Sequence, residues 1–131
     1  MKAQPEQAEA VMLMRAVRGA EHEWPELRFF AHWPNGGHRS RRTAAQLKAE
    51  GVRRGPPDYW FPVPRGGYVG LVIELKRLEG CRPTKEQRDW LTELSANGWQ
   101  TAVAHGWEQA FAVLKDYLAA DGAAANDEDL P

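Results

Sequence analysis

The stretch from Val69 to Lys76 constrains the fold most, because it is the most apolar strand-like segment of the chain and still carries an acid and a base. Alternate residues of a β-strand point to the same face, so Glu74 and Lys76 should project together. The aliphatic residues of the other face should turn inward: Leu71, Ile73 and Leu75. Burying charged side chains is unfavourable unless they pair or coordinate an ion. The segment therefore predicts a core strand that carries a chemical site.

A second acid, Asp58, follows the turn-forming residues Gly55-Pro56-Pro57 and precedes this strand. Two carboxylates can hold Mg²⁺ through their oxygens, and a neighbouring lysine can orient a water and offset charge on a phosphoryl group. The order of turn acid, hairpin and Glu-x-Lys is what metal-dependent phosphodiester cleavage requires. A plainer interpretation stays open on spacing alone: Asp58 only forms a turn, and Glu74 with Lys76 forms a solvated ion pair.

Composition favours one folded domain with a short tail. A length of 131 residues with 43% hydrophobic content is enough to bury a core. The 17 basic and 18 acidic residues are unevenly spread, because four acids and no bases lie in residues 121–131. Residues 1–120 therefore carry a net charge of +3, which permits nucleic-acid binding. We expect a domain over residues 1–120 and an acidic, disordered tail over residues 121–131.

The sequence gives little support for a cysteine or histidine metal site, or for a membrane-spanning segment. Cys81 is the single cysteine, so neither a disulfide framework nor a cysteine zinc site is expected. The four histidines, His32 and His38 among them, show no ligand spacing with one another. No segment resembles a signal peptide or approaches the ~20 apolar residues that span a bilayer. We therefore expect a cytoplasmic protein.

Hydrophobic periodicity and turn signals predict the elements and their order. The expected helices are Glu6–Val17, Thr43–Glu50, a helix capped by Thr84 that ends near Ala96, and Trp107–Ala119. Gly19 would end the first helix, which would pack through Ala8, Val11, Met12 and Ala16. The expected strands are Leu27–Trp33, Tyr59–Val63, Tyr68–Lys76 and Trp99–Ala104, the middle two forming a hairpin. The order α-β-α-β-β-α-β-α predicts an α/β domain with a mixed sheet.

Several ordered motifs make the chain resemble a stand-alone VRR-NUC domain, a phage and prophage type within the PD-(D/E)xK nuclease superfamily. The resemblance covers residues 5 to 119. It rests on His32-Trp33-Pro34-Asn35-Gly36-Gly37-x-Arg39, Leu47-Lys48-Ala49-Glu50-Gly51-Val52, Gly55-x-Pro57-Asp58, Gly67-Tyr68-x-Gly70-Leu71-x-Ile73-Glu74-Leu75-Lys76, Gln87 and Gly98.

The resemblance implies a restriction-endonuclease-like αβββαβ core, with a mixed central sheet flanked by helices. It also implies a DNA endonuclease that depends on Mg²⁺ or Mn²⁺. Asp58 and Glu74 would be metal carboxylates, the backbone carbonyl of Leu75 a further ligand, and Lys76 the catalytic lysine. Gln87 would match the family's downstream glutamine, although glutamine at this helical position is also an ordinary capping-box residue.

The first helix departs from the family pattern. Glu6 would match the family's N-terminal acid, but the glutamine and tryptophan that often follow it are replaced here by Ala10 and Ala16. The choice between Glu6 and Glu9 as the metal ligand therefore stays open. The usual single proline before Asp58 is replaced by Pro56-Pro57, which should stiffen the turn and keep the carboxylate.

Basic and polar residues near the motifs are candidates for phosphate contacts. They are Asn35, Arg39, Arg41, Arg53 and Arg54. The alternative is a tight turn at Asn35 and a solvated charged face for the arginines. The tryptophans are expected in the core or in a dimer contact rather than as platforms for nucleic-acid bases: Trp33, Trp60, Trp90, Trp99 and Trp107.

Stand-alone family members are thought of as acting on branched DNA such as four-way (Holliday) junctions. Two symmetric cuts need two active sites, so a homodimer is the economical expectation. Two alternatives belong to other classes: a catalytically inactive DNA-binding module, and a small α/β adaptor protein with an exposed ion pair. The adaptor would gain no stability from Mn²⁺.

Overall fold

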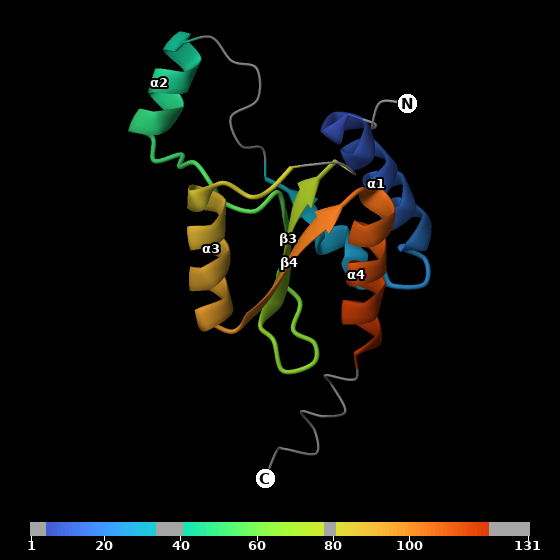
Figure 1. Cartoon of the computed structure of the whole chain (residues 1–131). Coiled ribbons are helices and arrows are strands. Elements are labelled where there is room, and N and C mark those ends of the chain that lie inside the picture. Colours follow the sequence, from blue (N-terminus) through green and yellow to red (C-terminus); the bar gives the residue numbers. More distant parts are fainter. Residues whose placement is uncertain (1–4, 34–40, 78–80, 121–131) are drawn as a thin grey trace.

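The computed structural model describes residues 5–33, 41–77 and 81–120, and the predicted tail over residues 121–131 lies outside this part. A mixed sheet with helices on both faces forms the body (Figure 1). In chain order the elements are α1 (Glu6–Ala20), the 3₁₀-helix η1 (Pro25–Phe29), β1 (Ala31–His32), α2 (Arg41–Ala49), β2 (Tyr59–Phe61), β3 (Gly70–Lys76), α3 (Lys85–Ala96), β4 (Trp99–His105) and α4 (Trp107–Ala119).

The sheet of the described residues has the strand order β1-β2-β3-β4. The first three strands run antiparallel, with Tyr59 opposite Ile73, and β4 runs parallel to β3, with Lys76 opposite His105. Helices α1 and α4 cover one face, and α3, the crossover between β3 and β4, covers the other (Figure 1). The predicted α/β class, mixed sheet and order of elements are confirmed, and β3 lies between two strands as the apolar sequence requires.

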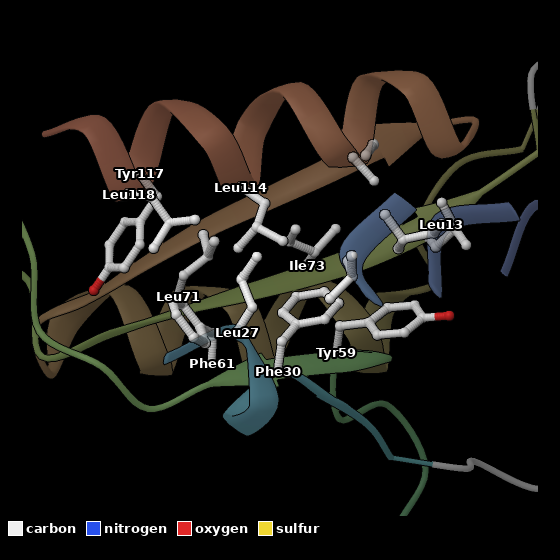
Figure 2. Close-up of a cluster of buried hydrophobic side chains, with 14 residues drawn as sticks. Leu13, Leu27, Phe30, Tyr59, Phe61, Leu71, Ile73, Leu114, Tyr117 and Leu118 are labelled. Carbon is white, nitrogen blue, oxygen red and sulfur yellow. The ribbon is translucent and has the colours of Figure 1, made fainter. Parts of the chain in front are cut away.

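The hydrophobic core lies between the sheet and the layer formed by α1 and α4. Figure 2 shows Leu114 and Tyr117 of α4 lying over Leu71 and Ile73 of β3. The ring of Phe30 stacks on Tyr59 with centroids 5.1 Å apart. As predicted, the alternate residues Leu71, Ile73 and Leu75 belong to this core. The other residues of β3, Glu74 and Lys76 included, therefore point towards the α3 side of the sheet.

Residues 27–33 do not form the predicted strand. Pro25 begins a 3₁₀-helix, and β-structure is limited to Ala31 and His32. In a 3₁₀-helix residues three apart lie on the same side, which allows both Leu27 and Phe30 to be buried. The prediction was wrong because aromatic and β-forming residues are also compatible with a short helical segment when their side chains are buried in the core.

Helix α1 is longer than predicted and buries a different face. It continues through Gly19 to Ala20, and it buries Glu9, Leu13 and Val17. Val11, expected to pack inward, is 51% exposed. The buried face was predicted wrongly because Glu9, an acid, occupies a core-facing position. The buried residues are therefore each one position away from those expected, as with Leu13 in place of Met12 and Val17 in place of Ala16.

The two ends of α3 are formed as predicted. Thr84 accepts a hydrogen bond from the Gln87 N–H, and the Gln87 side chain reaches back to the Thr84 N–H, so the capping box is present. Gly98 has a φ of 94° after α3, as the expected helix stop requires. Helix α2 lies apart from the layered body (Figure 1). Within the described ranges, no helix combines the length and apolarity needed to cross a bilayer.

Gly70→Ala should lower the free energy of unfolding by about 1–3 kcal/mol. A Cβ at Gly70 would lie 2.4 Å from the Trp99 ring and 2.9 Å from the Phe61 carbonyl oxygen, so the strand or the indole must move. Chemical denaturation of the variant and the wild-type protein measures the difference.

Gly19→Ala is the matched control. A Cβ there meets nothing within 4 Å, and the residue lies inside α1. The substitution should be neutral or stabilise the protein by up to about 1 kcal/mol. Equal stability changes for the two variants would contradict the close packing of Trp99 on β3.

Candidate active site

Glu74 and Lys76 form a buried ion pair at the carboxyl end of β3. Glu74 is 1% exposed and Lys76 is 8% exposed. Lys76 Nζ lies 3.3 Å from Glu74 Oε2. The solvated ion pair considered from the sequence is therefore wrong, and the two side chains share one face because they are two residues apart on a strand. A buried charge pair of this kind must be held by further polar contacts.

Asp58 lies beside this pair, directly before β2. Its Oδ2 accepts a hydrogen bond from the Leu75 N–H at 2.8 Å, so the turn acid is attached to the strand that carries Glu74 and Lys76. The turn itself packs closely on α3: Gly55 has a φ of 103°, and a Cβ there would lie 2.8 Å from the Glu86 carbonyl. The Pro56-Pro57 sequence keeps the carboxylate next to β3.

Gln87, in the first turn of α3, joins the two charges of β3. Its Nε2 donates to Glu74 Oε2 at 2.7 Å, and its Oε1 accepts from Lys76 Nζ at 3.0 Å. The same Oε1 accepts from the Thr84 N–H at 2.8 Å. The helix cap and the contact with the site are therefore both made by one side chain, and the capping box fixes the amide where it meets Glu74 and Lys76.

The electrostatics of the two acids favour an added positive charge. Burial, followed by the charge of Asp58, raises the pKa of Glu74 to about 7. Burial also raises the pKa of Asp58, and the nearby charge of Glu6 raises both. Glu74 Oε1 is buried and has no hydrogen-bond partner. Buried polar atoms are rarely left without a partner, so this oxygen is suited to an ion.

The residues fit a divalent cation in part. Asp58 and Glu74 offer carboxylate oxygens, which Mg²⁺ and Mn²⁺ prefer, and the unpartnered Oε1 of Glu74 is one of them. Leu75, whose carbonyl is the predicted further ligand, lies between Glu74 and Lys76 on β3. Among the described residues, however, no three His, Cys, Asp or Glu side chains are grouped as a metal site. Glu6, whose charge acts on both of these acids, is the candidate third carboxylate.

The two acids of α1 have different surroundings. Glu9 is buried, and its Oε1 accepts from the Trp107 N–H at the start of α4 at 2.7 Å. Its carboxylate thereby caps α4, where the helix dipole favours negative charge. Glu6 is exposed, and its charge acts on Asp58 and Glu74. The geometry thus leaves Glu6 as the candidate ligand and gives Glu9 a structural role.

The candidate DNA-binding residues are only partly described. Asn35 and Arg39 lie outside the described residues, and Arg41 is described only as the first residue of α2. Arg53 and Arg54 are exposed in the segment before the Gly55–Asp58 turn. The Arg54 carbonyl accepts from Trp90 Nε1 at 3.2 Å, so this basic segment is attached to α3 beside the site.

Two histidines near the site were not predicted. His105 is paired with Lys76 in the parallel register, which places it on the same face of the sheet, and its Nδ1 lies 3.3 Å from the Arg77 carbonyl oxygen. His32 lies close enough to Asp58 for its charge to lower the pKa of that acid. Spacing between histidines could not indicate either one, because His32 acts on Asp58 and His105 is paired with Lys76, each in another segment of the chain.

Replacing each acid of α1 should distinguish their roles. Glu9→Ala should lower the free energy of unfolding by about 1–3 kcal/mol, because the Trp107 N–H loses its acceptor. Glu6→Ala should change stability little, because Glu6 is exposed, but should weaken the stabilisation that Mn²⁺ provides. Urea unfolding with and without Mn²⁺ measures both effects. The reverse pattern would make Glu9 the ligand.

In the metal-free protein, stability should fall as pH rises between about 4.5 and about 7. The folded-state pKa of Glu74 is raised from 4.5 to about 7, so the folded protein keeps a proton that the unfolded chain releases over this range. Unfolding in EDTA across this range should give a shallower slope for Glu74→Gln than for the wild-type protein. Glu108→Gln, an exposed acid of α4, is the control and should keep the wild-type slope. Equal slopes for all three proteins would contradict the raised pKa.

Comparison with known proteins agrees with the motifs. No family model matches the chain, and no curated protein matches it. The structure is similar to a solved structure described as a "VRR_NUC domain protein", with a TM-score of 0.75 and 25% sequence identity, over 92% of this chain and 94% of that one. The resemblance to VRR-NUC domains is therefore confirmed in three dimensions, and it points to a nuclease.

Proposed function

We propose that this protein is a DNA endonuclease that hydrolyses phosphodiester bonds with Mg²⁺ or Mn²⁺ bound. The observation that carries the proposal is the buried pair Glu74 and Lys76 with the half-buried Asp58 and Gln87 beside it, at one end of the sheet. In it, Glu74 Oε1 is buried without a partner. Such an oxygen beside a second acid and a lysine is the pattern of a metal-assisted phosphodiesterase.

Asp58 and Glu74 would hold the cation, with the Leu75 carbonyl and Glu6 as further ligands. When bound, a divalent ion lowers the pKa of a coordinated water and stabilises charge on the phosphoryl and leaving oxygens. The protein places two carboxylates where burial raises the pKa of each, and the charge of Asp58 raises the pKa of Glu74 further. The hydrogen bond from the Leu75 N–H keeps Asp58 aligned with β3.

Lys76 would orient the attacking water and offset the charge that develops on the phosphate. Its ammonium group is held between Gln87 Oε1 at 3.0 Å and Glu74 Oε2 at 3.3 Å. Because Gln87 is itself held by the cap of α3, the lysine needs little rearrangement to act. Gln87 is therefore a positioning residue for both Glu74 and Lys76.

The nucleic acid would approach over the exposed basic segment that includes Arg53 and Arg54. Lysine and arginine side chains that neutralise phosphates supply most of the sequence-independent affinity for DNA. Asn35, Arg39 and Arg41 are proposed to add to this contact. The chain offers no sequence-reading motif, so selection would depend on the shape of the DNA.

We further propose branched DNA as the substrate and a homodimer as the active form. A junction is resolved by two symmetric cuts, and a two-fold dimer supplies one site for each strand. The adaptor alternative loses its support, because the ion pair on which it rested is buried. The inactive binding module also lacks support, because Glu74, Lys76 and Gln87 are bonded to one another and Asp58 is held beside them by the Leu75 N–H.

The wild-type protein should cut a synthetic four-way junction in Mn²⁺ and leave an unbranched duplex of the same sequence largely uncut. Lys76→Ala should lower the cleavage rate by about 100-fold or more, and EDTA should abolish cleavage. Lys85→Ala is the matched control, because the side chain of this lysine of α3 is 77% exposed and pairs with Asp89 on the helix surface. Gel electrophoresis of end-labelled strands measures the rates.

The same experiment separates the alternatives. Binding without cleavage in every metal would make the protein a DNA-binding module. Equal cleavage of junction and duplex would keep the nuclease and reject the structural selectivity. Absence of both DNA binding and Mn²⁺ stabilisation would return the adaptor to consideration. Thermal unfolding of Lys76→Ala tests whether a loss of activity is only a loss of folding.

A further inference from the structure

Trp33 exposes a large aromatic surface beside the candidate active site. It follows β1 and is 53% exposed, although a core or dimer contact was expected for it. Its backbone N–H donates to the Asp58 carbonyl oxygen at 2.6 Å. Trp33, which carries the exposed ring, is therefore hydrogen-bonded directly to Asp58, one of the two acids of the site.

The ring of Trp33 stacks on Trp60, and a third indole, Trp99, meets Trp60 edge to face. The centroid of the Trp33 ring lies 4.9 Å from that of Trp60, with an angle of 27° between the planes. Trp60 in turn meets the edge of Trp99 at 5.3 Å. Trp60 also donates from Nε1 to the Pro57 carbonyl oxygen at 2.9 Å, in the turn that leads to Asp58. The stack holds the inner face of Trp33 in place and leaves much of its surface exposed.

The stack lies on the same face of the sheet as Glu74 and Lys76. Trp60 is paired with Val72, two residues before Glu74, and Trp99 is paired with Gly70. Paired residues on neighbouring strands share a face, so the indoles and the acidic site lie on the same face of the sheet, against which α3 also packs.

We propose that Trp33 is a stacking platform for an unpaired DNA base next to the phosphate that is cut. This inference rests on the proposed function and narrows its substrate to DNA with an unstacked base, at a branch, gap or frayed end. Inside a duplex both faces of a base are covered by its neighbours, so an indole can stack only where a neighbour is missing. The platform would thereby select the structure of the DNA without reading its sequence.

Charge favours a nucleic acid over a second copy of this chain as the occupant. The basic segment with Arg53 and Arg54 is exposed and leads directly into the Gly55–Asp58 turn. Aromatic rings combined with nearby basic side chains are the usual means of binding single-stranded DNA. A second copy of this chain would bring the same positive charges to the contact.

Binding in EDTA tests the platform without any cleavage. Fluorescence anisotropy would compare a four-way junction with unpaired bases at its centre, a single-stranded oligonucleotide and a blunt duplex. Trp33→Ala should weaken binding of the first two by roughly 10- to 100-fold and leave the duplex within about threefold, whereas Trp33→Phe should keep most of the affinity. Phe29→Ala is the matched control, because Phe29 is 52% exposed but packs against Arg28 outside the indole stack.

A 2-aminopurine at the unpaired position gives a direct signal of stacking. Its fluorescence should be quenched when the wild-type protein binds, and Trp33→Ala should remove that quenching at saturating protein. The proposal would be overturned if Trp33→Ala bound the DNA and quenched the fluorescence as strongly as the wild-type protein does. Full recovery by Trp33→Leu, an apolar side chain without a π-face, would also overturn it.

Two further results separate the occupants and the proposals. A change in oligomeric mass with Trp33→Ala, at unchanged DNA affinity, would make Trp33 a dimer contact. Base-dependent quenching in a protein that cuts no DNA in Mn²⁺ would reject the nuclease and leave the platform standing. If the wild-type protein and Trp33→Ala cut the DNA at the same rate and bind it with the same affinity, the nuclease would stand and the platform would be rejected.

Discussion

The buried pairing of Glu74 with Lys76 is the interaction on which the rest of the site depends. Two charges removed from water are stable only when their attraction is joined by further hydrogen bonds. Gln87 supplies such bonds to both partners, and Asp58 is held beside them through the Leu75 N–H. The buried strand, the turn before β2 and the cap of α3 must therefore be in place together. One carboxylate oxygen of Glu74 is buried without a hydrogen-bond partner.

A second set of contacts joins the helical layer to the same end of the sheet. The Gly106 N–H donates to the Lys76 carbonyl oxygen at 2.7 Å, so α4 begins where β3 ends. The next N–H, of Trp107, is taken up by Glu9 of α1. Helix α1 is thereby held against α4 near the end of β3 that carries the acids, with Glu6 one turn earlier. By capping α4, the buried Glu9 thus also sets the position of the exposed Glu6, which lies on α1 as well.

The main parts of the fold could be predicted because their signals are local. The apolar run of β3, the hairpin before it and the capping box at Thr84 each depend on a few neighbouring residues, and each is present. The failures share a different cause. A 3₁₀-helix over Pro25–Phe29 replaces the first part of the predicted strand because Leu27 and Phe30 are both buried in the core. Helix α1 turns Glu9 inward because the start of α4 provides a donor. Those partners are distant in sequence.

The sequence by itself determined the class of the fold and the identity of the chemical groups. An acid after a turn and a Glu-x-Lys strand follow from spacing, since the period of a β-strand decides which residues share a face. Tertiary structure alone decided that this pair is buried, that Gln87 bridges it, and that Trp33 stands exposed on a stack of indoles beside Asp58. The physical reason is that burial, pKa and exposure depend on which distant segments pack together. Local periodicity carries no information about those neighbours.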